Sequence, residues 1–64
     1  MSTQTRSNLV ALIEELRRSA ARNRALALES HLDRPWRRHD VRIYMERELD
    51  DLRAIMILEG ELAT

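Results

Sequence analysis

The sequence predicts an all-α fold, an antiparallel two-helix hairpin that dimerises into a four-helix bundle. Helix breakers are scarce, because the 64 residues include one glycine and one proline. That proline, Pro35, separates two stretches in which apolar residues recur at helical spacing. The chain is also short and has no cysteine for disulfides or a zinc cluster. A core of this size is marginal, so we expect the hairpin to associate.

The first predicted helix covers about residues 7–32 and follows a flexible, polar tail at residues 1–6. Ser7 is a suitable N-cap because a serine hydroxyl accepts a hydrogen bond from the first helical turn. Asn23 falls on the inner stripe, either as a buried residue that fixes register or as a solvent-facing one. The apolar positions expected to face the second helix are Leu9, Leu12 or Ile13, Leu16, Ala20, Leu26 or Ala27, and Leu32.

The predicted turn lies at about residues 33–36, because proline disfavours helical geometry in the preceding residue and suits a helix start. The second helix then covers about residues 36–60, with Asp40 as an alternative start and Gly60 as the expected stop. The sequence leaves open whether Trp36 belongs to the turn or to this helix. Its expected inner stripe is Val41, Met45 with Tyr44, Leu49, Leu52, Ile55 or Met56, and Leu62.

Charges support an antiparallel pairing of these helices. With a turn near residue 34, residues that lie level have numbers that sum to about 70. The arginines of the first helix should then lie level with acids of the second, and two glutamates level with Arg53. The basic set is Arg17, Arg18, Arg22 and Arg24, opposite Glu46, Glu48, Asp50 and Asp51, while Glu14 and Glu15 lie opposite Arg53.

Apolar residues surround both helices at the end of the hairpin away from the turn. Residues 9–13 and 55–58 are apolar on nearly every side, so one helix neighbour covers only part of them. The remainder should form a patch of the kind that marks an interaction surface. We expect it to form a homodimer, with a helix of another protein as the alternative partner. The predicted association residues are Leu9, Val10, Leu12, Ile13, Leu16, Leu52, Ile55, Met56 and Leu58.

A second, polar surface is predicted at the turn. The formal net charge of zero argues against bulk attraction to nucleic acid, so such binding would need a local patch. An arginine cluster with an aromatic ring can hold phosphates and stack on a base. A solvated turn, with Trp36 covering the end of the bundle, is the favoured interpretation. The nucleic-acid alternative rests on Arg34, Trp36, Arg37, Arg38 and Arg42.

No catalytic, metal or cofactor signature is found. His31, Asp33, His39 and Asp40 gather near the turn, but the histidines lack the i,i+4 spacing of helical metal ligands. Ser30, His31 and Asp33 are too close in sequence to adopt triad geometry on one turn. No glycine-rich loop is present to hold phosphates. We therefore expect no enzyme activity, no cofactor and no metal.

The expected function is a small protein–protein interaction module, that is, a regulator, adaptor or chaperone-like subunit acting as a dimer. A nucleic-acid-binding regulator is the alternative. No apolar run approaches the ~18–20 residues of a membrane span. The N-terminal residues also lack the layout of a signal peptide. We expect a cytoplasmic protein that does not contact a membrane, and the sequence does not identify its partner.

Overall fold

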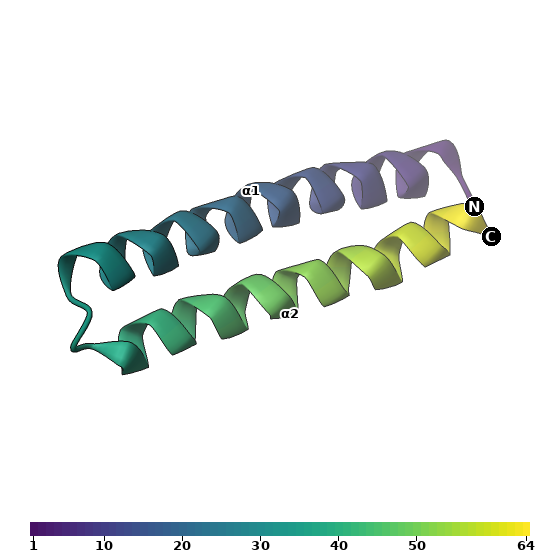
Figure 1. The fold of residues 1–64 in the computed structure, drawn as a ribbon. Helices are drawn as coiled ribbons and strands as arrows, with labels where there is room; N and C mark the ends of the chain where they lie inside the picture. The colour runs from purple at the N-terminus through teal and green to yellow at the C-terminus, as the bar shows by residue number, and fades with distance from the viewer.

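Two long helices and a short loop make up the computed structural model, which describes residues 1–64 (Figure 1). Helix α1 covers Thr3–Asp33 and α2 covers Arg38–Ala63. They run antiparallel, so both chain ends lie at the end of the hairpin opposite the loop (Figure 1). The molecule is a rod with principal extents of 49 × 14 × 11 Å. The predicted all-α, two-helix hairpin is confirmed.

Helix α1 begins at Thr3, not near Ser7, so residues 3–6 are helical. Ser2 is the N-cap: its backbone is extended and its hydroxyl oxygen accepts a hydrogen bond of 3.1 Å from the backbone N–H of Thr5. Gln4 Nε2 also donates to Asn8 Oδ1 at 3.0 Å within the first turns. The sequence offers two serines of equal capping ability, and the structure uses the earlier one.

The loop covers residues 34–37, one residue later than the predicted turn. Arg34 closes α1 by donating its backbone N–H to the Ser30 carbonyl at 2.9 Å. A tight turn follows, in which the Arg37 N–H donates to the Arg34 carbonyl at 2.9 Å. Pro35 occupies the second position of that turn, where its fixed φ is favoured. Trp36 therefore lies in the loop and not in α2.

Helix α2 passes through Gly60 and ends at Ala63, so the expected stop at Gly60 is wrong. A glycine ends a helix by adopting a left-handed backbone, and Gly60 has no positive φ. The end is instead marked by Thr64, whose hydroxyl donates to the Glu61 carbonyl at 2.9 Å.

The contact between the helices, which we call the seam, has the alternating spacing of three and four residues that is typical of coiled coils. Only Ile13, Ala20, Ala27 and Ile55 are buried, and the other seam residues are half-buried. From α1 the seam contains Leu9, Ile13, Leu16, Ala20, Asn23, Ala27 and Ser30, and from α2 it contains Val41, Tyr44, Glu48, Asp51, Ile55, Leu58 and Leu62.

The predicted inner stripe of α2 is therefore wrong by one residue over most of its length. Met45, Leu49, Leu52 and Met56 each directly follow a seam residue and are exposed. The physical reason is that α2 carries two apolar stripes, and one neighbouring helix covers only one of them. Packing Ile55 and its apolar neighbours against α1 carries Glu48 and Asp51 into the same seam. On α1, Leu26 and Leu32 are likewise exposed rather than inward-facing.

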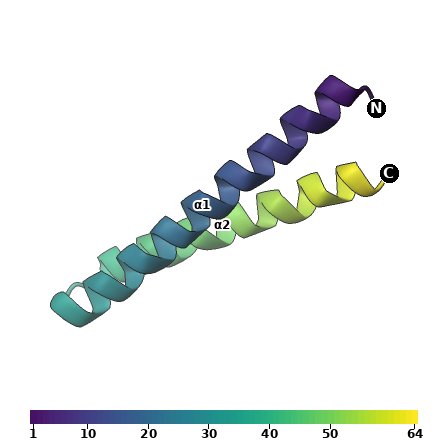
Figure 2. The ribbon, with the colours of Figure 1, turned by 90° about the horizontal axis from the view of Figure 1, so that it is seen from above.

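The predicted charge pairing between the helices does not form. Arg18 and Arg22 contact Glu15 of their own helix, at 2.9 and 3.6 Å. Arg17 reaches Glu59 at 2.7 Å, nearer the open end than expected. The three arginine side chains are 60–63% exposed and lie beside the seam, so Arg18 and Arg22 pair within α1 and only Arg17 reaches across to α2. Figure 2 shows the two helices crossing, with their ends spread apart in that view at the open end.

Candidate interaction surfaces

The predicted association residues fall into two groups. Ile13 and Ile55 are buried in the seam, and Leu9, Leu16 and Leu58 are half-buried there, so the hairpin itself uses them. The remaining members stay exposed, namely Val10, Leu12, Leu52 and Met56. They do not form one patch, because Val10 and Leu12 are two residues apart and so point to nearly opposite sides of α1.

The largest ordered apolar surface is a row on α2, here called the α2 stripe: Met45, Leu49, Leu52 and Met56. Their side chains are 54, 48, 43 and 72% exposed. The spacing of four, three and four residues places them in one line along the helix, over about 17 Å. Met45 and Leu49 were predicted to face α1. The sequence feature that could have revealed this surface is that α2 carries two rows of heptad-spaced residues, one residue apart, of which a single neighbouring helix covers only one.

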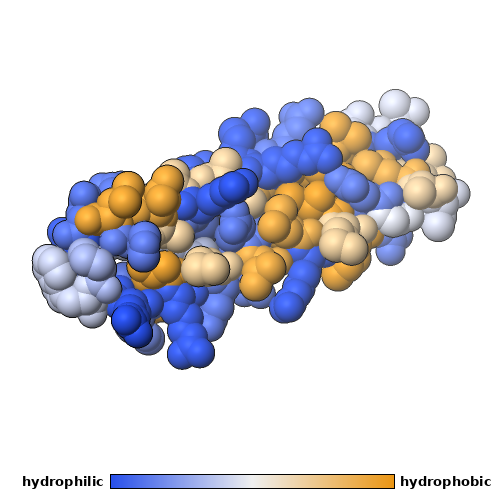
Figure 3. All heavy atoms as spheres, viewed as in Figure 1, coloured by the Kyte–Doolittle hydropathy of each residue, from blue (hydrophilic) through white to orange (hydrophobic).

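The α2 stripe continues onto α1 near the loop. A shallow hollow on this face joins Met45 and Glu48 of α2 to Arg24, Leu28 and His31 of α1. Leu28 is itself exposed. Figure 3 shows one face of the hairpin, where hydrophobic atoms gather in several places with hydrophilic side chains lying between them. At the hollow, the apolar side chains have charged neighbours in Arg24 and Glu48.

The other exposed apolar side chains are scattered. Leu26 lies on the opposite side of Ala27 from Leu28, beside a hollow lined mainly by polar groups that include Glu29 and Asp33. Ile57 directly follows Met56 and so points about 100° away from the α2 stripe. Single exposed apolar residues are normal on protein surfaces and indicate no site.

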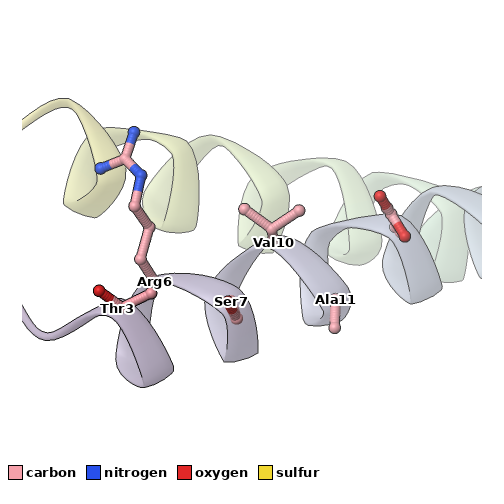
Figure 4. Close-up of a pocket in the computed structure, with 6 residues that line it drawn as sticks. Thr3, Arg6, Ser7, Val10 and Ala11 are labelled. Atoms are coloured by element: carbon pink, nitrogen blue, oxygen red, sulfur yellow. The ribbon is translucent and has the colours of Figure 1, made fainter.

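The hollow at the open end contains no catalytic arrangement. It is lined by side chains of α1 alone, among them Thr3, Ser7 and Ala11 (Figure 4). Figure 4 shows Arg6 extending towards the end of α2, where its Nη1 donates to the Leu62 carbonyl at 3.5 Å. This arginine tethers the two chain ends and leaves no set of converging polar groups.

The predicted polar patch at the loop is formed by exposed side chains. Trp36 is 75% exposed, so it does not cover the end of the hairpin as was favoured from the sequence. Arg37 pairs with Asp40 at 3.0 Å, and Arg42 with Glu46 at 3.7 Å. Arg34 and Arg38 form no ion pair, and their guanidinium groups are free.

Asn23, whose direction the sequence left open, lies half-buried in the seam. Its side-chain Nδ2 donates to Asp51 Oδ2 at 3.3 Å, which is a long hydrogen bond between the two helices. No buried side-chain polar atom lacks a partner. Asn23 therefore provides a hydrogen-bond donor for Asp51, whose side chain the packing of α2 places in the seam.

The pKa of Glu15 is lowered from its ordinary value by neighbouring arginines. Hydrogen bonds from Arg18, at 2.9 and 3.2 Å, together with the Arg18 charge, lower the pKa of Glu15, and the charge of Arg22 lowers it further. The cluster is on the solvent side of α1, where it acts as an ordinary surface ion network.

No group of three or more His, Asp or Glu side chains converges to hold a metal ion. Neither helix has an apolar stretch long enough to span a bilayer.

Comparison with known proteins gives no relative. No family model matches the chain, and no curated protein and no solved structure is significantly similar to it.

Proposed function

We propose that this chain is a small cytoplasmic protein–protein interaction module, a regulator, adaptor or chaperone-like subunit, that acts as a dimer of helical hairpins in a four-helix bundle. The observation that carries the proposal is the α2 stripe, whose apolar side chains are 43–72% exposed in heptad register. A heptad-spaced apolar row is the surface that one helix presents to another.

Energetics favour covering this stripe. The isolated hairpin buries only 4 of its 64 residues, which is a small core for a folded chain. Removing the exposed half of a Leu or Met side chain from water is worth on the order of 1 kcal/mol. Each copy contributes the whole stripe, so a dimer gains this burial twice over, against the entropic cost of association.

The direction of the stripe also suits a bundle. Each stripe residue follows a seam residue, so the stripe is rotated by about 100° from the seam. In a four-helix bundle each helix contacts two neighbours that are separated by about 90° around its axis. Helix α2 thus has one apolar face for α1 and another at the angle that a further helix requires.

Sedimentation equilibrium tests the proposal with two neighbouring substitutions. Wild-type protein should have twice the mass of the 7.6 kDa chain at micromolar concentration. Met56→Asp should shift the protein to monomer, because it places a charge in the stripe. Ile57→Asp is the matched control, since Ile57 is 67% exposed but lies off the stripe, and it should remain dimeric. A wild-type monomer, or equal effects of both changes, would contradict the proposal.

A second candidate function, nucleic-acid binding, is favoured by one observation at the loop. Trp36 is exposed beside the unpaired guanidinium groups of Arg34 and Arg38, which suits base stacking and phosphate contact. A gel shift at low salt that disappears in the double variant Arg37→Glu, Arg38→Glu would support it. The double variant Arg18→Glu, Arg22→Glu, on the solvent side of α1, is the charge-matched control. Absence of any shift would remove this candidate.

A further inference from the structure

The two edges of the α2 stripe differ in how their charges are satisfied. The edge that faces α1 carries Glu48 and Glu59, and Glu59 is held by Arg17 of α1 at 2.7 Å. The outer edge carries Glu46 and Arg53, seven residues apart and so on the same side of the helix. Arg53 forms no ion pair in the hairpin, and Glu46 has only a 3.7 Å contact with Arg42.

We propose that the α2 stripe is covered by α2 of a second copy, lying antiparallel about a two-fold axis between the levels of Leu49 and Leu52. This inference rests on the proposed function and specifies its geometry. In this arrangement Leu49 packs against Leu52 of the second copy, and Met45 packs against Met56 of the second copy. The same surface thus serves both copies, as a two-fold interface requires.

Charge complementarity selects the antiparallel orientation. The midpoint between Glu46 and Arg53 lies within one residue, about 1.5 Å, of the midpoint of the stripe. The two-fold axis therefore brings Glu46 beside Arg53 of the second copy, and by symmetry this pair occurs twice. A parallel pairing about a two-fold axis would instead place the outer edge of one copy against the inner edge of the other, with Glu46 near Glu48 of the second copy. Like charges at an interface disfavour that orientation.

The rest of the outer edge is compatible with this arrangement. Arg42 lies level with Gly60 of the second copy, and a glycine brings no side chain to that position. Gly60 also has open space around it in the hairpin, with no heavy atom near the place of a Cβ. Helix α2 then has two neighbours, α1 along the seam and the second α2 along the stripe.

Cysteine cross-linking tests this geometry without background, because the chain has no cysteine. Met45→Cys and Met56→Cys chains, one carrying a size tag, are oxidised separately and as a mixture. In the antiparallel dimer, residue 45 of one copy lies about 17 Å along the helix axis from residue 45 of the second copy, which is too far for a disulfide. The mixture should therefore give a disulfide-linked dimer of one tagged and one untagged chain. Each variant oxidised alone should give little disulfide-linked dimer. Ile57→Cys, off the stripe, should cross-link with neither.

A charge exchange provides a second, independent measurement. In the Glu46→Arg variant, the new arginine of each copy lies beside Arg53 of the other copy, so the repulsion occurs twice. Dimerisation should weaken about tenfold. Adding Arg53→Glu in the same chain should restore the affinity, because the pair is then reversed and not broken.

The outcomes separate this inference from the proposed function. Self-cross-linking of Met45→Cys would show a parallel pairing and overturn the inference. A dimer by mass with no stripe cross-link would also overturn it, while leaving the proposed dimer intact. A wild-type monomer at all concentrations would contradict the proposed function itself.

Discussion

The two halves of the hairpin are held together by different chemistry. In the open half, the seam consists of branched aliphatic side chains, namely Leu9, Ile13, Leu16, Ile55, Leu58 and Leu62. In the loop half, it consists mainly of small and polar residues, with Val41 and Tyr44 as the larger members; the others are Ala20, Asn23, Ala27, Ser30, Glu48 and Asp51. Yet most of the large apolar residues of the loop half lie on the outside, among them Leu28, Leu32, Trp36 and Met45.

This difference separates the residues that stabilise the hairpin from those that we propose to contact a second copy. Burial of large apolar side chains stabilises the hairpin at its open end. Near the loop, the alanines of α1 allow close approach, and the apolar side chains left outside remain available to a partner. The α2 stripe spans both halves, and its turn end merges with Leu28 of α1.

The open half should be the more sensitive to truncation. Ile55→Ala removes a buried side chain of the aliphatic seam and should lower the free energy of unfolding by about 2–4 kcal/mol. Ala27→Gly, at an equally buried position of the loop half, should cost about 1 kcal/mol through helix propensity. Urea unfolding followed by circular dichroism, at one fixed protein concentration, measures both. Equal losses would contradict the division.

The polar half of the seam should depend on the contact between Asn23 and Asp51. Asn23→Ala removes a half-buried hydrogen bond between the helices and should cost about 1 kcal/mol. Asp51→Ala should cost a similar amount, and the double variant should cost less than the sum of both. Additive losses in this double-mutant cycle would mean that the two side chains do not interact.

The Arg17–Glu59 pair should contribute less than either half of the seam. Both side chains are about half exposed, so Glu59→Gln should cost about 0.2–1 kcal/mol at low ionic strength. The loss should shrink when salt is added, because screening weakens exposed pairs. A salt-independent loss would indicate that Glu59 acts through packing rather than charge.

The smallest expected effect is a pH dependence from Glu15. Its pKa is lower in the folded chain than its ordinary value of 4.5, through Arg18 and then Arg22. The ionised form is therefore favoured by folding, and its contribution is present above about pH 4.5 and lost as pH falls through the folded pKa. Thermal unfolding of Glu15→Gln should differ from wild type near neutral pH and converge with it in acid. A constant difference would contradict this origin.

Much of the fold follows from the sequence, because the scarcity of breakers and the position of Pro35 leave two helices and one loop. The choice of seam does not follow from it. The residues of the α2 stripe are more apolar than Tyr44, Glu48 and Asp51, so hydrophobicity alone assigns the stripe to the interior. Instead, the packing of Ile55, Leu58 and Leu62 against α1 at the open end fixes the rotation of α2 about its own axis. Because the helix is continuous, the same rotation determines which face of α2 meets α1 near the loop.

The candidate site was predicted in part for the same reason. Leu52 and Met56 were expected to mediate association, but Leu52 was also assigned to the inner stripe, together with Met45 and Leu49. The exposure of Trp36 was also not predicted, since an aromatic residue beside a proline is equally compatible with covering the end of the bundle. Such choices depend on contacts between distant residues, and local sequence patterns do not encode them.

The central claim is that α2 of a second copy covers the α2 stripe, and methionine methyl NMR tests it most directly. The chain has three methionines, and Met45 and Met56 lie about 17 Å apart along α2, too far for a contact within one chain. A mixture of differently labelled copies should show an intermolecular contact between the Met45 and Met56 methyl groups. Contacts of Met45 with Met45, or no intermolecular contact in a sample that is dimeric by mass, would contradict the claim.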